Sequence, residues 1–270
     1  MASNILTDEF CLLQGVKQGD ILSPLLFALY ISDMPTIEEF KSSFPPKIIQ
    51  YADDTVSIAS SPSEIIKQID TMISYGNSLG LEINYSKTKI LKIQLNKRFP
   101  TDETFSYKIG IESIELVDEF KYLGIPFTSN LKWDLAIRTA INRGNTTINA
   151  LKAHNINPFL ISQYHHNLLI NSKIYGTTLY GAQLWGCYCN DKINEPMINY
   201  FKKIFNLPSF TASLLIYKEF DLYSKLPTAQ YLAINYLHKA NHSDNALISN
   251  AFISIRKLKF NNNLIVKSEN

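Results

Sequence analysis

Two short apolar runs flank a pair of acidic residues in the first quarter of the chain. Residues 47–50 and 55–59 are rich in β-branched side chains, which is typical of short strands. Between them stands the tetrapeptide Tyr51-Ala52-Asp53-Asp54. The tight connection predicts a hairpin with both acids at or near its tip.

Helical patterns lie on either side of this hairpin. Ser23 and Pro24 are typical of an N-cap followed by the first helical residue, and residues 25–31 are almost wholly apolar, which predicts a buried helix. The segment Ser61-Pro62-Ser63-Glu64 is a capping box, and apolar residues then recur at helical spacing until Leu79-Gly80 ends the helix.

Strand patterns follow, and helical patterns dominate after them. The expected strands are residues 81–84, 89–95, 107–111, 114–117 and 120–127, the last three as a small antiparallel set. One long apolar face runs from Trp133 to Leu151, although Gly144 weakens it. Further helices are expected over residues 159–175, 197–207, 228–239 and 246–259. The pattern therefore predicts an α+β fold.

Composition says little about function, but the distribution of charge along the chain bears on whether the protein binds nucleic acid. The chain has 270 residues, which suits one large or two modest domains, and its 46% hydrophobic content is enough for a normal core. The net charge of +2 is too small to indicate a nucleic-acid partner. The first sixty residues are acidic on balance, whereas basic residues outnumber acidic ones over residues 87–152, with aromatic residues interleaved. A mixed, solvated surface explains the basic stretch equally well.

The acidic pair suggests metal-dependent chemistry. Adjacent carboxylates repel each other, and a divalent cation with oxygen ligands would remove that conflict; Mg²⁺ commonly binds through one or two carboxylates plus substrate phosphates. Upstream, Gly15 and Gly19 allow a turn that could present backbone amides and the Gln18 side chain to a substrate. The alternatives are a solvated Asp-Asp turn and an ordinary glycine turn before a core helix.

Five stretches of this chain resemble, in order, the sequence blocks of one family, the reverse transcriptases of non-LTR (LINE-type) retrotransposons. The stretches are Gly15-Val16-Lys17-Gln18-Gly19 with its following Leu22-Ser23-Pro24-Leu25-Leu26-Phe27, Tyr51-Ala52-Asp53-Asp54-Thr55, Gly80-Leu81-Glu82-Ile83-Asn84-Tyr85-Ser86-Lys87-Thr88, Phe120-Lys121-Tyr122-Leu123-Gly124, and Tyr180-Gly181-Ala182-Gln183-Leu184-Trp185-Gly186. The resemblance covers about residues 8–190. It implies a partial polymerase palm over residues 1–128, an antiparallel sheet with packed helices, and a mostly helical thumb-like and connector region over residues 129–270.

The resemblance also implies a reaction and the residues that perform it. The family makes DNA on an RNA template with two Mg²⁺ ions, extending a DNA primer with deoxynucleotides. Asp53 and Asp54 match its catalytic metal ligands, and Lys87 matches a basic residue that helps the departing pyrophosphate. The remaining matches are to positions that contact nucleotide or primer, namely Gln18, Gly19, Tyr51, Lys121, Tyr122, Leu123 and Gly124. Lys121 to Gly124 correspond to the primer-grip hairpin.

One departure from the family matters for activity. Its third metal-binding aspartate lies upstream of the glycine turn, where this sequence offers only fourteen residues, and the basic fingers region is also missing. We therefore expect the chain to be inactive alone, unless the missing N-terminal half is supplied in trans. Two other readings stay open, a non-catalytic module that binds primer and template, and a relative of group II intron maturases.

The remaining features bear on location rather than chemistry. Three cysteines are too few for a full zinc site, and an odd count without a signal peptide favours a reducing interior. No apolar run reaches membrane-spanning length. The sequence thus predicts an intracellular protein of the nucleus or cytoplasm, with no membrane partner.

Overall fold

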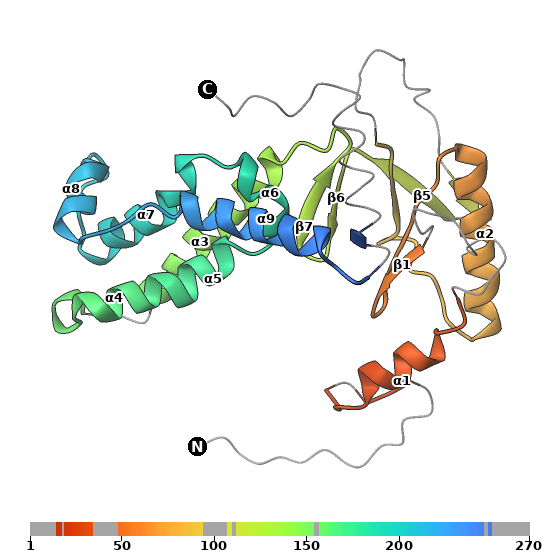
Figure 1. The fold of residues 1–270 in the computed structure, drawn as a ribbon. Coiled ribbons are helices and arrows are strands. Elements are labelled where there is room, and N and C mark those ends of the chain that lie inside the picture. The colour runs from red at the N-terminus through yellow and green to blue at the C-terminus, as the bar shows by residue number, and fades with distance from the viewer. Residues whose placement is uncertain are drawn as a thin grey trace, which may run out of the picture. The chain divides into compact units, whose positions relative to one another are not determined.

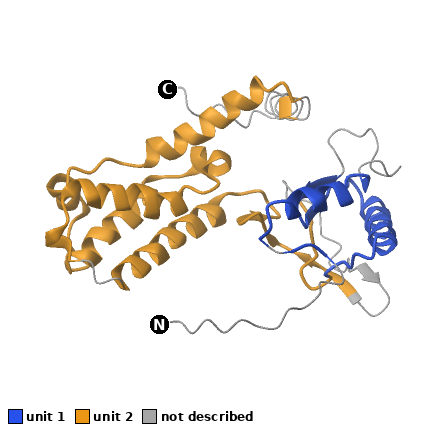
Figure 2. Cartoon of the chain, turned by 90° about the horizontal axis from the view of Figure 1, so that it is seen from below, with its two compact units in different colours: residues 1–84 blue, residues 85–270 orange. Residues whose placement is uncertain are grey.

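The computed structural model describes residues 15–17, 19–34, 48–93, 107–109, 112–153, 157–245 and 248–249. The chain divides into two compact units, residues 1–84 and residues 85–270, which Figure 2 shows in different colours. We refer to them as the N-terminal and the C-terminal unit and describe each by itself. The predicted palm boundary near residue 128 is a functional assignment that this division does not test.

The N-terminal unit contains the predicted hairpin. Strands β1 (Ile48–Tyr51) and β2 (Asp54–Ser57) pair antiparallel, with Tyr51 opposite Asp54. Helix α2 (Pro62–Ser78) follows (Figure 1). Its N-cap is confirmed, because Ser61 Oγ accepts a hydrogen bond from the Glu64 amide at 3.2 Å. The Glu64 carboxylate accepts a hydrogen bond from the amide of Ser60 at 2.7 Å, one residue before the N-cap residue that a capping box would use.

The first helix differs from the prediction in its burial. Helix α1 (Ser23–Tyr30) forms as expected, but it has no buried residue, and Leu25 and Leu29 are 58% and 61% exposed. The apolar sequence indicated burial because such residues normally require a partner surface. Burial begins only past the helix, at Ile31 and Met34. The sequence thus predicted the helix correctly and its environment wrongly.

The C-terminal unit begins with small sheets rather than one continuous sheet. Its strands are β3 (Lys89–Leu91), β4 (Tyr107–Ile109), β5 (Glu112–Val117), β6 (Glu119–Tyr122) and β7 (Ile125–Thr128). Strand β5 pairs parallel with β3 and antiparallel with β4, while β6 and β7 form a separate antiparallel hairpin.

Two strand predictions need correction. Residues 81–84 are not a strand: Gly80 has φ +68°, and the Leu81 amide donates to the Gly76 carbonyl at 2.8 Å, so the backbone is still closing helix α2. The single strand expected over residues 120–127 is the β6–β7 hairpin, because Leu123 and Gly124 both adopt positive φ and reverse the chain.

Helices make up the rest of the C-terminal unit. They are α3 (Asp134–Ala153), α4 (Gln163–Leu169), α5 (Tyr175–Thr178), α6 (Ala182–Trp185), α7 (Glu195–Ile204), α8 (Ser213–Glu219) and α9 (Leu226–Asn241). A π-helical stretch, Ile170–Ile174, joins α4 to α5. The helix expected over residues 246–259 lies almost entirely outside the described residues. The mixture of small sheets and packed helices confirms the α+β class.

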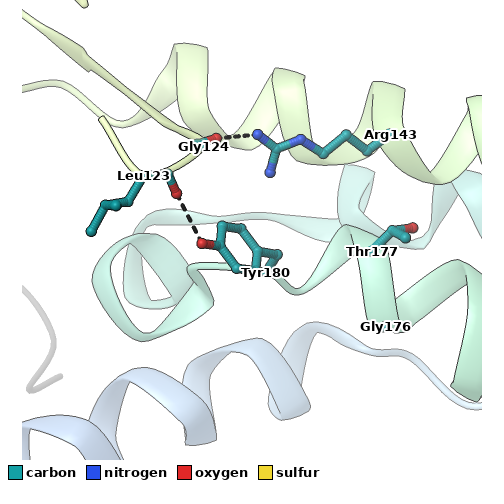
Figure 3. A pocket seen from close by; sticks show the side chains of 6 residues that line it. All are labelled: Leu123, Gly124, Arg143, Gly176, Thr177 and Tyr180. Atoms are coloured by element: carbon teal, nitrogen blue, oxygen red, sulfur yellow. Dashed lines mark hydrogen bonds between the residues drawn. The ribbon is translucent and has the colours of Figure 1, made fainter. Parts of the chain in front are cut away.

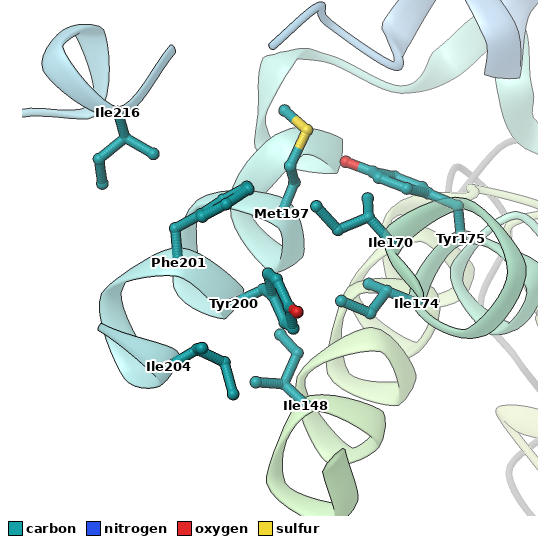
Figure 4. Close-up of a cluster of buried hydrophobic side chains, with 9 residues drawn as sticks. All are labelled: Ile148, Ile170, Ile174, Tyr175, Met197, Tyr200, Phe201, Ile204 and Ile216. Carbon is teal, nitrogen blue, oxygen red and sulfur yellow. The ribbon is translucent and has the colours of Figure 1, made fainter. Parts of the chain in front are cut away.

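Two apolar clusters hold these helices together. The larger one packs α3 against α7 and the π-helical stretch (Figure 4), and its buried members are Ile148, Ile170, Ile174, Tyr175, Met197, Tyr200, Phe201, Ile204 and Ile216. The second cluster joins α3, α6 and α9 around Trp185, which is 1% exposed. Gly186 lets α9 approach closely, because a Cβ there would lie 2.0 Å from the Ala229 carbonyl oxygen.

Candidate functional site

The acidic pair lies where the sequence predicted, at the tip of the β1–β2 hairpin. Since Tyr51 pairs with Asp54, the turn consists of Ala52 and Asp53 alone. Ala52 has φ +53°, a left-handed conformation that a residue with a Cβ adopts at a cost. All four residues of the tetrapeptide are exposed, and Tyr51 is 63% exposed. The hairpin therefore presents both carboxylates to solvent beside an aromatic ring.

The two carboxylates have room for a cation. Within the described part of the chain, no residue forms a hydrogen bond or an ion pair with the side-chain carboxylate of Asp53 or Asp54. Ionised carboxylates are acceptors only, so their oxygens are available for a hard cation. The two carboxylates fit Mg²⁺, because that ion takes one or two protein carboxylates and fills its remaining coordination positions with water or phosphate oxygens.

Among the described residues, the acidic pair is not part of a larger group of metal-binding side chains. Among the residues that the structure describes, no group of three or more histidine, cysteine, aspartate or glutamate side chains is arranged to hold a metal ion. A site at the hairpin tip would thus use two carboxylates from these residues and oxygens from the substrate.

A buried glutamine that the sequence analysis did not single out supports the hairpin. Gln68 of α2 is 1% exposed, accepts a hydrogen bond from the Ser57 hydroxyl and donates to the Ile58 carbonyl at 3.3 Å. It ties the end of β2 to the helix behind it. The available signal was a polar residue beside Ile69 on the apolar face of the helix, since a buried polar side chain needs partners.

The glycine turn upstream is described except at one position. Gly15 and Gly19 both have φ +87°, which confirms the expectation that these positions require glycine. Gln18 lies outside the described residues. Ser23 does not cap the helix: its hydroxyl donates to the Lys17 carbonyl at 2.6 Å, and Leu22 occupies the N-cap position. This bond connects the turn to the start of α1.

The other candidate residues belong to the C-terminal unit. Lys87 is exposed in the turn that precedes β3. Lys121 is exposed on β6 and Tyr122 is half-buried beside it, while Leu123 and Gly124 form the two-residue turn to β7. The structure thus groups Tyr51, Asp53 and Asp54 in one unit, and Lys121 to Gly124 in the other. That all of them share one site remains a prediction.

The β6–β7 turn is held by residues that the sequence analysis missed. Figure 3 shows the Tyr180 hydroxyl donating to the Leu123 carbonyl, at 2.8 Å, and the Arg143 guanidinium donating to the Gly124 carbonyl. These four residues line a cavity of about 440 Å³ together with Gly176 and Thr177. Tyr180 belongs to the family-like stretch at residues 180–186, although its contact with the turn was not predicted. Nothing in the sequence except its positive charge distinguished Arg143.

No helix among the described residues is both long enough and apolar enough to cross a lipid bilayer.

Comparison with known proteins gives a family for the first half of the chain. A family model described as reverse transcriptase (RNA-dependent DNA polymerase) matches residues 2–127. No solved structure matches the chain significantly.

Three curated relatives extend this result. A retrovirus-related Pol polyprotein from a type-2 retrotransposable element of Drosophila melanogaster is 28% identical over 209 residues, which are 71% of this chain and 20% of the relative. A corresponding polyprotein from the type-1 retrotransposable element R2 of Popillia japonica is 28% identical over 134 residues, 46% of this chain and 22% of that protein. A putative uncharacterized transposon-derived protein of Caenorhabditis elegans is 34% identical over 76 residues, 28% of this chain and 26% of that protein.

The chain spans only 20% to 26% of the length of these relatives. The family match covers the glycine turn, the acidic hairpin and nearly all of the β6–β7 hairpin. Residues 2–127 therefore belong to the reverse transcriptase family, and the chain is of the non-LTR retrotransposon type.

Proposed function

We propose that this chain contributes the two-carboxylate part of the catalytic palm of an RNA-directed DNA polymerase. In this proposal residues 1–128 are palm, and residues 129–270 are a helical thumb-like and connector region. One observation carries the proposal: within a segment that matches the reverse transcriptase family, a hairpin tip presents two adjacent, exposed carboxylates, Asp53 and Asp54, that no described residue binds.

The proposed roles follow from the chemistry of each side chain. A Mg²⁺ ion, when bound, stabilises the charge that develops on phosphate oxygens during nucleotidyl transfer. Asp53 and Asp54 supply oxygen ligands on a short, paired hairpin, which limits their movement. Tyr51 offers an exposed ring on which a base can stack. Lys87 places a positive charge that favours a leaving pyrophosphate.

The proposed substrates are an RNA template, a DNA primer and deoxynucleotides. Gln18 and Gly19 belong, in this proposal, to the nucleotide and template pocket. The turn of the β6–β7 hairpin, Lys121 to Gly124, receives the 3′ end of the primer. Its exposed lysine and its position in the family-matched segment support this assignment.

We expect the chain alone to extend primers poorly. Two-metal transfer requires ligands that hold both ions at a fixed separation, and two adjacent carboxylates are too few. Loss of one electrostatic element of such a site often costs on the order of a hundredfold or more in rate. The second candidate is therefore a module that binds primer and template without chemistry, favoured by the grouping of only two carboxylates among the described residues.

Cation binding tests the proposed site directly. Mn²⁺ is titrated into the chain with a primer–template hybrid and a deoxynucleotide, and bound metal is followed by water proton relaxation. We expect Asp53→Asn and Asp54→Asn each to weaken binding at least tenfold. Asp70→Asn, at an exposed position of helix α2 in the same unit, is the charge-matched control and should bind as the parent does. Equal binding by all variants would exclude the hairpin tip as the metal site.

Primer extension separates the two candidates. The chain is assayed on an RNA template with Mg²⁺, alone and with an upstream polymerase segment of a relative added in trans. Synthesis that appears only with the added segment, and that Asp53→Asn abolishes, supports the polymerase. Hybrid binding without synthesis in either case supports the binding module.

A further inference from the structure

Two backbone carbonyls of the β6–β7 turn are bound by side chains from distant parts of the C-terminal unit. The Tyr180 hydroxyl donates to the Leu123 carbonyl at 2.8 Å, across 57 residues of sequence. The Arg143 guanidinium donates to the Gly124 carbonyl from helix α3. Both bonds end on adjacent peptide units at the point where the chain reverses (Figure 3).

This turn has an unusual need for such support. Leu123 has φ +45° and Gly124 has φ +78°, so both central residues of the turn are left-handed. That geometry matches the twist of the two strands, but it favours Asn-Gly or Gly-Gly because a larger side chain is disfavoured at positive φ. Leucine at the first position therefore weakens the local preference. External hydrogen bonds to both carbonyls offset that weakness.

The two donors also support each other. The Arg143 guanidinium carbon lies 5.7 Å from the centre of the Tyr180 ring, within the range of a cation–π interaction. The space between turn and donors is closely filled, since a Cβ on Gly124 would lie 3.4 Å from Tyr180 Cε1 and 3.8 Å from Arg143 Nη2. Arginine, tyrosine and turn thus form one connected unit, which we call the turn clamp.

The clamp adjoins open, positively charged space. Arg143 lines both the cavity of about 440 Å³ beside the turn and a second cavity of about 510 Å³, which Lys121 also lines with hydroxyl and amide side chains of α3. Two cations with hydroxyl donors around them suit the phosphodiester backbone of a nucleic-acid strand. A ligand in this space would touch the turn that the clamp orders.

We propose that Arg143 and Tyr180 are positioning residues that fix the β6–β7 turn in the conformation that receives the 3′ end of a primer strand. This inference rests on the proposed primer-binding role of Lys121 to Gly124 and deepens it. Neither side chain needs to touch a reacting atom. Each acts by holding a backbone carbonyl, and the helical region is thereby connected to the primer-binding turn.

Photo-crosslinking tests the inference in the intact chain. A DNA primer with a 3′-terminal 5-iododeoxyuridine is annealed to an RNA template and bound to the protein, and crosslinked peptides are mapped by mass spectrometry. We expect the parent chain to crosslink within residues 121–125. Tyr180→Phe should lower that yield about fivefold, the effect of losing one hydrogen bond. Arg143→Lys should lower it as well, because a flexible ammonium replaces the planar guanidinium that donates to the Gly124 carbonyl. In Tyr180→Phe the affinity for the hybrid should change less than twofold, because this exchange removes no positive charge.

Matched variants give the controls. Tyr231→Phe removes a hydroxyl from an exposed tyrosine of α9, and Arg138→Lys makes the same exchange on an exposed position of α3. Both should crosslink as the parent does. The second measurement is amide hydrogen exchange without nucleic acid. The amides of residues 123–125 should exchange about fivefold faster in Tyr180→Phe than in the parent, whereas Tyr231→Phe should leave their exchange unchanged.

The outcomes separate the inference from the proposal beneath it. Parent-like crosslinking and exchange in both clamp variants would overturn the positioning role while leaving the primer-binding turn in place. A parent chain that binds the hybrid but never crosslinks at residues 121–125 would instead overturn the primer-binding assignment. If one clamp variant unfolds, the other decides, because Phe keeps the ring of Tyr180 and Lys keeps the charge of Arg143.

Discussion

Gly144 of α3 lies directly against Thr178 of α5, so closely that a Cβ on Gly144 would be 2.3 Å from Thr178 Oγ1. The threonine is fully buried, and its hydroxyl donates to the Ile174 carbonyl at 2.7 Å. On the other side, the Cβ and Cγ atoms of Pro196 would each be 2.9 Å from the added carbon. The absence of a side chain at this position allows α3 to contact two neighbouring segments at once.

Gly144→Ala should therefore destabilise the C-terminal unit, although alanine favours helices. Overpacking against backbone-anchored neighbours costs about 1–3 kcal/mol, which exceeds the gain of about 1 kcal/mol in helix propensity. Thermal or denaturant unfolding measures the change. Gly176→Ala on α5 is the control, since a Cβ there would meet nothing within 4 Å. It should be neutral or stabilising, and an equal loss in both variants would contradict the close-packing argument.

The strained turn of the acidic hairpin gives a second prediction. Ala52 is left-handed at φ +53°. Ala52→Val should cost about 1–2 kcal/mol, because a β-branched residue tolerates this region poorly. Glycine adopts it freely, so Ala52→Gly should leave stability within about 0.5 kcal/mol of the parent. Denaturant unfolding followed by a probe in the N-terminal unit compares the pair. Equal stability of the two variants would show that this backbone conformation does not matter.

Gln68 supplies a third prediction, about the support of the hairpin. Gln68→Leu should cost about 1–3 kcal/mol, since the Ser57 hydroxyl and the Ile58 carbonyl lose their partner in a partly buried place. Amide hydrogen exchange in residues 54–58 should also become faster in this variant. Asn77→Leu, on an exposed position of the same helix, is the matched control. A parent-like hairpin in Gln68→Leu would contradict the anchoring role.

The two described cysteines should differ in reactivity. Burial raises the pKa of Cys189 to about 11, and its thiol donates to the Gly186 carbonyl at 3.0 Å. Cys187 is exposed. At pH 8 only roughly one Cys189 thiol in a thousand is ionised, and the thiolate is the reactive form. Iodoacetamide followed by peptide mapping should modify Cys187 and spare Cys189 until the chain unfolds.

The same shift carries a pH dependence with a definite sign. The folded pKa of Cys189 lies above the ordinary thiol value of 9.0, so the folded state binds the proton more tightly than the unfolded state. This contribution to stability is complete below about pH 9 and is lost as the pH rises toward about 11. Cys189→Ala should remove that part of the alkaline decline. An unchanged decline in the variant would contradict the assignment to this thiol.

Local signals predicted much of the fold. The N-terminal cap at Ser61 and Glu64, the paired strands around the acidic tip and the left-handed glycines at positions 15 and 19 depend on residues a few positions apart. Backbone preferences and short-range hydrogen bonds decide such features, so a sequence pattern is sufficient to find them. The ordered family blocks likewise depend on residue identity alone, and the family match over residues 2–127 includes the first four of them.

The failures share a physical cause as well. Gly144 was interpreted as a weak point in its helix, because glycine has a low helix propensity. Helix propensity contains no information about Thr178 and Pro196, which pack where a side chain at position 144 would lie. The alternation over residues 120–127 predicted one strand, because it continues across a two-residue reversal, and only the family resemblance placed a hairpin there. Helix α1 was expected to be buried, because an apolar sequence indicates a need for a partner and not whether one is present.

The amino-acid sequence by itself determined the family, the α+β class, the hairpin with its two carboxylates and the N-terminal cap of helix α2, since these depend on residue types at short separation. Only the tertiary structure decided that Gln68 anchors the acidic hairpin and that Thr178 packs directly against Gly144. It likewise decided that Arg143 and Tyr180 both bind the β6–β7 turn. Those contacts join residues that are 10 to 57 positions apart. Their existence depends on how packed helices and strands bring the chain together, which no local preference specifies.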